Sequence, residues 1–326
     1  MAAEALVEVA RAKLNLALCV LGRRPDGYHE LDTVMANVEP ADELALQLWA
    51  GQPPGVVGLA MEGPEAAALE RAGLALTEVL PLADAARSGN LVLRAAAALA
   101  RRAGRSDMPA VFLRLTKRIP AGAGLGGGSS DAAAALRGLN RLWGLGLGPA
   151  ELEAVAAAVG ADVAFCVRGG VQRARGKGER LEPLASRLTA ACLIVAPPET
   201  APTALAYRIW DEEQGGAAAR SQRGRCQVED LARALAEGDM GEAARHIAND
   251  LASAACRLCP STGRILEILK EAGCEGVSVS GSGCAAFGLA PPCEAEAVRR
   301  RLAGRLAEAL PDSRLFVSAL PVVESI

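Results

Sequence analysis

Aromatic residues are the scarcest large side chains in this 326-residue sequence and make up only 3% of it. No run of apolar residues approaches the length of about 18 that a membrane-spanning helix needs. An excess of either charge is also lacking, because 35 Lys and Arg stand against 38 Asp and Glu, for a net charge of −3. These absences argue against a membrane protein and against a charged surface for nucleic acid or anionic lipid. Any phosphate group must therefore be bound locally.

A regular cysteine framework is lacking as well, although the chain has nine cysteines. An odd number at irregular spacings argues against a secreted disulfide scaffold and favours a reducing cytoplasm. Cys256 and Cys259 form a single CxxC motif without a second one, so we expect these thiols to pack on a helix face rather than to bind metal. Residues 14–22 resemble the core of a signal peptide but contain Asn15 and lack a small-residue cleavage site. We expect a cytoplasmic protein.

The abundant residues are Ala, Leu, Val and Gly, which is typical of a compact protein with closely packed helices. Alternating apolar segments predict strands at 5–21, 43–49, 111–119, 191–196, 276–290 (a pair) and 314–321. Longer periodic segments predict helices at 91–102, 131–143, 151–159, 228–237, 241–256, 261–272 and 293–309. We expect 51–89 to be a surface excursion with one helix, and 211–225 to be an exposed insertion. The mixed order predicts an α+β fold.

The strongest local signal is the glycine-rich segment Pro120–Asp131. Five glycines within seven positions let the backbone approach an anion without interference from side chains: Gly122, Gly124, Gly126, Gly127 and Gly128. Successive N–H groups can form a concave anion site. Ser129, Ser130 and Asp131 then open an Ala-rich helix, whose positive N-terminal end faces the same anion. We expect this loop to bind the phosphates of ATP, with the serine hydroxyls donating to phosphate oxygens or helping to hold Mg²⁺.

Other glycine-rich motifs fit this segment less well. No Gly-Lys-Ser/Thr ends it, so it is not a Walker loop. It is not a dinucleotide fingerprint either, because no acidic residue ends a second strand about 20 residues further on. The plain alternative is a flexible linker or a simple helix cap. A linker would not run from an alternating strand directly into a capped helix.

Two charged residues suit phosphoryl transfer. Period two over 5–21 places Lys13 and Asn15 on one face of a strand, about 7 Å apart. Asp162 lies alone among apolar residues in GADVAF. A Lys13–Asp162 pair would orient or deprotonate a hydroxyl and neutralise charge during transfer. The alternatives are an ordinary helix cap for Asp162 and a solvated strand residue for Lys13.

Two further segments suit ligand binding. Tyr28 and His29 follow a turn, where a ring can stack on a base and an imidazole can hydrogen-bond its edge. The segment 278–284, Ser-Val-Ser-Gly-Ser-Gly-Cys, lies between two predicted strands. Its paired glycines would let backbone close over phosphates, but a simple tight turn is an equally good interpretation.

Five motifs occur in the order typical of GHMP kinases, which the chain resembles over most of residues 8–325: ARAKLNLAL, GRRPDGYHELDT, PAGAGLGGGSSDAA, GADVAF and VSGSGCAAF. The chain is most similar to members that act on a cytidine-linked methylerythritol. The resemblance implies transfer of the γ-phosphate of ATP to the 2-hydroxyl of 4-diphosphocytidyl-2-C-methyl-D-erythritol, in the non-mevalonate (methylerythritol phosphate) isoprenoid pathway. It also implies a ribosomal-S5-domain-2-like N-terminal domain (1–180) that binds ATP. A ferredoxin-like C-terminal domain (181–326) would bind the acceptor.

The resemblance also assigns residues to roles. Asp162 matches the catalytic base, and Lys13 matches the partner that steadies it and the reacting hydroxyl. Asn90 and Lys117 match positions near the adenine. The remaining nucleotide-binding positions lie in the glycine loop: Pro120, Gly122, Gly124, Leu125, Gly126, Gly127, Gly128, Ser129 and Ser130.

Four residues match positions around the cytidine. Asn15, Tyr28 and His29 match residues around it, and Tyr207 follows Pro202-Thr203 where the family has a second aromatic residue. Tyr28 and Tyr207 would sandwich the cytosine.

The chain departs from the family pattern in three places. Arg11 replaces the Pro that usually lies two residues before the Lys, and residues 51–89 and 211–226 are longer than the pattern. No additional carboxylate for Mg²⁺ is evident. Another GHMP kinase, acting on mevalonate, homoserine or a sugar, and a non-catalytic nucleotide-binding relative remain as alternatives. We expect a small-molecule substrate as the partner and no nucleic acid or membrane, for either a monomer or a homodimer.

Overall fold

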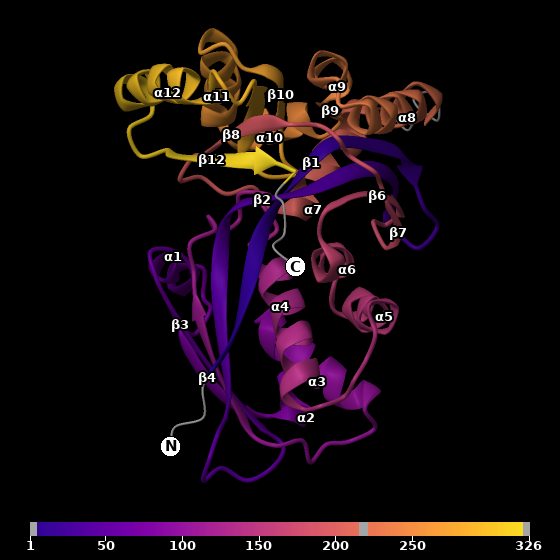
Figure 1. Cartoon of the computed structure of the whole chain (residues 1–326), viewed down its shortest axis with the longest axis vertical. Helices are drawn as coiled ribbons and strands as arrows, with labels where there is room; N and C mark the ends of the chain where they lie inside the picture. Colours follow the sequence, from indigo (N-terminus) through magenta and orange to yellow (C-terminus); the bar gives the residue numbers. More distant parts are fainter. Residues whose placement is uncertain (1–4, 215–220, 322–326) are drawn as a thin grey trace. The chain divides into compact units, whose positions relative to one another are not determined.

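The computed structural model describes residues 5–214 and 221–321 (Figure 1). The chain divides into two compact units, each made of separate segments. Unit 1 comprises Met1–Ala12, Ala41–Ala121 and Gly126–Arg168, and unit 2 comprises Lys13–Pro40, Gly122–Leu125 and Gly169–Ile326. The division predicted at residue 180 differs because the two long first strands each belong partly to both units. The assignment of ATP binding to residues 1–180 and of acceptor binding to residues 181–326 stays a prediction.

Unit 1 contains strands in the order β4-β3-β5-β2. Their bounds are β2 (His29–Leu48), β3 (Val56–Glu62), β4 (Thr77–Pro81) and β5 (Val111–Thr116). β3 is parallel to β5, whereas β4 pairs antiparallel with β3 and β2 antiparallel with β5. Buried and more exposed residues alternate along β5, as expected for a strand with one face against a core.

Ala-rich helices of unit 1 pack against one another. The helices are α1 (Ala66–Arg71), α2 (Leu82–Ala85), α3 (Leu91–Arg102), α4 (Gly127–Leu142), α5 (Pro149–Val159) and α6 (Ala161–Arg168). α3 packs against α4 and α5, and α4 also packs against α6 (Figure 1). The small side chains of 95–98 and 132–135 are buried, which lets helix backbones approach closely. α4 is thereby fixed where it leaves the glycine loop.

The first part of unit 2 is built on the two long strands. β1 (Leu6–Arg23) pairs parallel with β9 (Ala248–Asn249). β2 pairs antiparallel with β6 (Val171–Gly176), which pairs antiparallel with β7 (Arg180–Pro183). These strands place residues 13–40 within unit 2.

The second part of unit 2 is a four-stranded antiparallel sheet in the order β10-β11-β8-β12. Its strands are β8 (Ala190–Ala196), β10 (Glu275–Val279), β11 (Ala286–Ala290) and β12 (Arg314–Leu320). α11 (Pro260–Glu271) and α12 (Ala295–Ala309) supply Ile265, Ile268 and Leu302 to a core shared with Leu193 and Val195. The other helices of the unit are α7 (Thr203–Gln214), α8 (Ser221–Glu237), α9 (Met240–His246) and α10 (Ala252–Leu258).

Most predicted elements are confirmed, including the α+β class and the strand pair at 276–290. The prediction for 51–89 was wrong, because this segment contains β3, β4 and two helices. The strand pattern of β3 is weakened by Gly58, where a Cβ atom would lie 2.5 Å from the Trp49 ring and 2.7 Å from the Phe112 ring. Close ring packing therefore requires a glycine in a strand, which lowers the sequence signal.

Three further boundaries differ from the predictions. The strand predicted at 43–49 begins at His29. The helix predicted at 241–256 is two helices separated by β9, because Ala248 pairs with Ala17 of β1. The insertion predicted at 211–225 falls partly outside the described residues, and its flanks belong to α7 and α8. The first two differences come from strand pairing between segments that are distant in the sequence, which local periodicity does not show.

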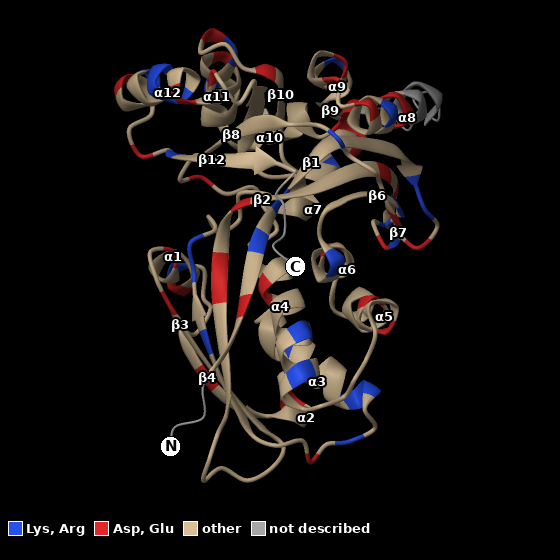
Figure 2. Ribbon diagram, viewed as in Figure 1, with Lys and Arg blue, Asp and Glu red and all other residues tan. Residues whose placement is uncertain are grey.

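Acidic and basic residues are interspersed along α11 and α12 (Figure 2). Ion pairs link them within one helix, as between Arg299 and Glu296 at 2.7 Å. In the described ranges, no helix combines the length and the apolar character needed to cross a bilayer.

Candidate active site

The glycine loop connects β5 to α4. Gly122, Gly124 and Gly126 have φ angles of +68°, +86° and +70°. This left-handed region favours glycine over other residues. Gly126 is the N-cap of α4, so the loop ends at the N-terminal end of a 16-residue helix. The first N–H groups of a helix have no partner within the helix, and this end therefore suits an anion.

The two serines of the loop differ in their surroundings. Ser130 is buried, and its hydroxyl donates to the Arg11 carbonyl oxygen at 2.6 Å. Ser129 is only half-buried. Of the two hydroxyls, that of Ser129 is therefore the better placed to reach a phosphate. Phosphate contacts by either serine stay predictions.

In unit 2, the turn at 280–283 packs against residues 123–124 of the loop. A Cβ atom on Gly124 would lie 2.2 Å from the Ser280 carbonyl oxygen, and one on Gly283 would lie 2.3 Å from the Gly124 nitrogen. The Ser280 hydroxyl donates to the Gly124 carbonyl oxygen at 3.0 Å. The second glycine motif is thus a turn that supports the first one.

A buried ionic cluster lies at the two ends of the loop, within unit 1. The Lys117 ammonium group donates to Asp42 and, at 2.6 Å, to Asp131. The other oxygen of Asp42 accepts from the backbone N–H groups of Arg118 and Ile119. Asp42 was not among the predicted site residues, because its contacts depend on the pairing of β2 with β5.

Charges within this cluster shift the pKa values of Lys117 and Asp131. Burial by itself lowers the pKa of Lys117, but the Asp131 and Asp42 carboxylates outweigh it and raise this pKa above its usual value. Burial raises the pKa of Asp131 to about 8, with Lys117 opposing the rise and Asp42 adding to it.

Asn90 is the N-cap residue of α3. Its Oδ1 accepts from the Val92 N–H at 2.9 Å, and its Nδ2 donates to the Met61 sulfur at 3.3 Å. Capping of α3 is therefore a sufficient structural reason for an Asn at position 90. The predicted adenine contacts of Asn90 and Lys117 are not tested by these interactions.

Lys13 and Asn15 interact on β1, as the alternation predicted. The Lys13 ammonium group donates to the Asn15 Oδ1 at 2.7 Å, and the Asn15 Nδ2 donates to the Thr33 hydroxyl at 2.9 Å. Both Lys13 and Asn15 are buried. A Cβ atom on Gly281 would lie 3.2 Å from the Lys13 Nζ, so the 280–283 turn also borders this ammonium group. The solvated-strand alternative for Lys13 is therefore wrong.

Asp162 lies in the first turn of α6, half-buried, directly after α5. It belongs to unit 1, whereas Lys13 belongs to unit 2. The predicted Lys13–Asp162 pair therefore stays a prediction.

The predicted cytidine residues Asn15, Tyr28, His29 and Tyr207 all belong to unit 2. His29 stacks on Tyr207, with ring centroids 4.6 Å apart. Its Nε2 lies 2.8 Å from the Asp211 carboxylate, and its ring meets Trp210 edge-on at 5.7 Å. Asp211 and Trp210 were missed because they gain a role only through their position on α7, one turn after Tyr207.

Tyr28 has a different setting. It is 60% exposed, which is the largest exposed fraction among the large hydrophobic residues in the described part of the chain. The Lys177 ammonium group lies 4.6 Å from its ring centroid. An exposed ring of this kind is available for stacking on a flat ligand. A cytosine sandwich between Tyr28 and Tyr207 stays a prediction.

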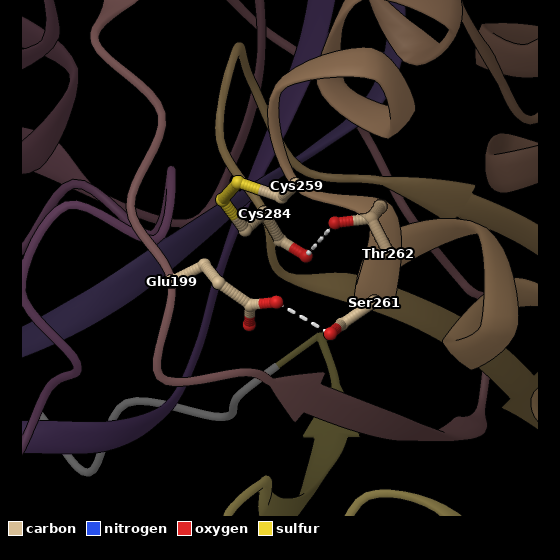
Figure 3. Close-up of a disulfide and its surroundings, with 5 residues drawn as sticks. All are labelled: Glu199, Cys259, Ser261, Thr262 and Cys284. Carbon is tan, nitrogen blue, oxygen red and sulfur yellow. Dashed lines mark hydrogen bonds between the residues drawn. A yellow bond between two sulfur atoms is a disulfide. The ribbon is translucent and has the colours of Figure 1, made fainter.

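A disulfide joins Cys259 and Cys284 (Figure 3). The expectation that Cys259 packs as a free thiol was therefore wrong. Cys259 precedes α11 and Cys284 follows the 280–283 turn, and the fold of unit 2 brings them together across 25 residues of sequence. Irregular spacing could not show this pairing. In Figure 3 the Thr262 hydroxyl donates to the Cys284 carbonyl oxygen, which fixes the same turn.

Comparisons with known proteins agree with these features. Residues 90–170 match the family model for the GHMP kinases N terminal domain, and residues 231–308 match that for the GHMP kinases C terminal. The chain is 38% identical to a 4-diphosphocytidyl-2-C-methyl-D-erythritol kinase of Pelotomaculum thermopropionicum, over 89% of this chain and 90% of that one.

Solved structures of kinases are similar to this chain as well. A crystal structure of 4-(cytidine 5'-diphospho)-2C-methyl-D-erythritol kinase has a TM-score of 0.69 and 35% identity, covering 96% of this chain and 98% of that one. Homoserine kinase from Cytophaga hutchinsonii has a TM-score of 0.75 at 20% identity, covering 97% and 94%, and shows the shared fold alone. Because identity to the first relative extends over nearly the whole of both chains, this chain belongs to the 4-diphosphocytidyl-2-C-methyl-D-erythritol kinases, within the GHMP kinases.

Proposed function

We propose that this chain transfers the γ-phosphate of ATP to the 2-hydroxyl of 4-diphosphocytidyl-2-C-methyl-D-erythritol. In this step a bond forms between the 2-oxygen and the γ-phosphorus, the bond to the β-phosphate oxygen breaks, and ADP leaves with the 2-phosphate product. The observation that carries the proposal is the 38% identity, over 89% of the chain, to a kinase named for this acceptor. The step belongs to the methylerythritol phosphate route to isoprenoids.

The ATP-binding residues are proposed from the loop and its neighbours. Three left-handed glycines at the start of α4 support a phosphate site formed by backbone N–H groups. Ser129 and Ser130 would add hydroxyl groups, and Asn90 and Lys117 would lie near the adenine. We assign these contacts to the predicted ATP-binding region, residues 1–180.

The chemical step is assigned to Asp162 and Lys13. Asp162 would accept or orient the proton of the 2-hydroxyl, while the Lys13 ammonium group would offset negative charge on the reacting oxygens. The hydrogen bond from Lys13 to Asn15 supports this role, because it holds a buried cation in one place. In loose phosphoryl-transfer transition states, such positioning contributes much of the rate.

The cytidine contacts are assigned to unit 2. Tyr28 would stack on the base from its exposed position, and Tyr207 would supply the second ring. His29 would bond the edge of the base, with Asp211 holding its orientation at 2.8 Å. The tautomer of His29 that donates from Nε2 to Asp211 has an acceptor at Nδ1, which would match the amino group of cytosine.

Mg²⁺ is part of the proposal. Within the described ranges, no three His, Cys, Asp or Glu side chains gather as a metal site. Mg²⁺ is often bound by substrate phosphates with one or two protein oxygens, so a hydroxyl such as that of Ser129 fits. When bound, the ion would neutralise charge on the transferring phosphates. We also propose a cytoplasmic enzyme with no nucleic-acid or membrane partner, as a monomer or a homodimer.

The test is ADP release with four acceptors: 4-diphosphocytidyl-2-C-methyl-D-erythritol, mevalonate, homoserine and galactose. We expect release only with the first. Release with one of the others would favour another GHMP kinase, since the fold is shared with such enzymes. ATP binding without release for any of the four acceptors would favour a non-catalytic relative.

A further inference from the structure

Three buried side chains link the chain entering the glycine loop to the helix leaving it. Asp42, on β2, accepts from the N–H groups of Arg118 and Ile119, the two residues before Pro120. Lys117 donates to Asp42 and to Asp131, the fifth residue of α4. All three are nearly fully buried, with exposed fractions of 0% for Asp42 and 3% for Lys117 and Asp131.

The ammonium group of this cluster also lies against the start of α4. A Cβ atom on Gly127, the first residue of that helix, would be 3.4 Å from the Lys117 Nζ and 3.1 Å from the Ile119 side chain. The cluster therefore contacts the loop on both sides of its glycines.

We infer that Asp42, Lys117 and Asp131 are positioning residues, which hold the two ends of the glycine loop at a fixed separation so that its N–H groups converge on a polyphosphate. This inference rests on the proposed function of the loop as a phosphate site. It gives Lys117 a role through the loop backbone, in addition to the adenine contact proposed for it above. An ion pair so deeply buried is costly to break, because the remaining charge would lack a partner.

The first experiment measures the KM for ATP of wild type and Asp131→Ala at one pH. We expect a rise of roughly tenfold in the variant, because Lys117 loses its contact with α4 while staying buried. The matched control is Glu8→Gln, which removes a carboxylate that pairs with Arg137 further along α4 and should keep the wild-type KM. An unchanged KM in folded Asp131→Ala would overturn the role of Asp131.

The second experiment measures binding of ATP, GTP and inorganic triphosphate by calorimetry to Lys117→Met and Asp42→Asn. We expect all three ligands to weaken by about tenfold or more in both variants, since the loop itself is displaced. Weakening of ATP alone would show that Lys117 acts on the adenine, and would overturn its positioning role. Unchanged binding of all three ligands in folded Asp42→Asn would refute the cluster as a positioning device. Wild type that binds none of them would instead refute the proposed function.

Discussion

At the scale of single residues, two carboxylates have separate roles in the proposed reaction. Asp162 lies at the start of α6 and would act on the hydroxyl that is phosphorylated. Asp211 lies on α7 and would act through His29, which it contacts at 2.8 Å. The first should affect turnover, whereas the second should affect binding of the acceptor.

Asp162→Asn should retain ATP affinity and lower kcat by about 100-fold or more, because an amide cannot accept the proton of the acceptor hydroxyl. Steady-state kinetics with both substrates, together with ATP binding by calorimetry, checks this. Asp84→Asn, in the short helix α2, is the matched control and should keep wild-type turnover. Near-normal turnover in Asp162→Asn would remove Asp162 as the base.

Asp211→Ala should raise the KM for the acceptor by roughly tenfold and leave the KM for ATP unchanged, since it releases the imidazole from one orientation. Asp211→Asn should show a smaller effect, because its amide oxygen can still accept from His29. Asp230→Ala, which breaks a surface pair with Arg233, serves as the control and should change neither constant. An equal rise in the two KM values for Asp211→Ala would contradict a role confined to the acceptor.

At the scale of elements, the site depends on turns that approach one another closely. Gly124 has a φ of +86° and faces the Ser280 carbonyl oxygen, while Gly283 faces residues 123–124 from the other side. Gly124 and Ser280 are 156 residues apart in sequence, yet neither Gly124 nor Gly283 tolerates a Cβ atom, because each faces the other turn. Their packing explains why unit 2 includes residues 122–125.

Gly124→Ala should lower the free energy of unfolding by about 3 kcal/mol or more, from left-handed strain and from the 2.2 Å approach to a backbone oxygen. Gly263→Ala, within α11 and with open space around it, should instead raise that free energy by about 0.5 to 1 kcal/mol. Denaturant unfolding of both variants measures the difference. Equal free energies of unfolding for Gly124→Ala and Gly263→Ala would show that the 123–124 segment can move away from the turn.

At the scale of the whole molecule, the order of strands and helices follows well from the sequence, but the division of the chain into two units does not. Alternation and helical periodicity place most strands and helices, and the glycine loop is found where it was predicted. The units are less predictable, because β1 and β2 each contribute to both. Residues 13–40 join the C-terminal segments through pairing of β2 with β6 and of β1 with β9.

The disulfide is also a property of the folded molecule. Reduction of the bond between Cys259 and Cys284 should lower the free energy of unfolding by about 3 kcal/mol, since the bond closes a loop of 25 residues. Cys284→Ser should show the same loss and no further response to reductant. Mass spectrometry of alkylated protein should find these two cysteines linked. Alkylation of both without reductant would show free thiols instead, as the sequence had suggested.

The sequence by itself determined the α+β class, the position of the glycine loop before α4, and the strand face that carries Lys13 and Asn15. These features are local: a strand alternates with period two, and a left-handed turn needs glycine whatever surrounds it. Only the tertiary structure decided that Asp42 joins Lys117 and Asp131, that Asp211 contacts His29, and that Cys259 bonds to Cys284. Those partners are distant along the chain, and their contacts come from strand pairing and helix packing, which no local pattern records.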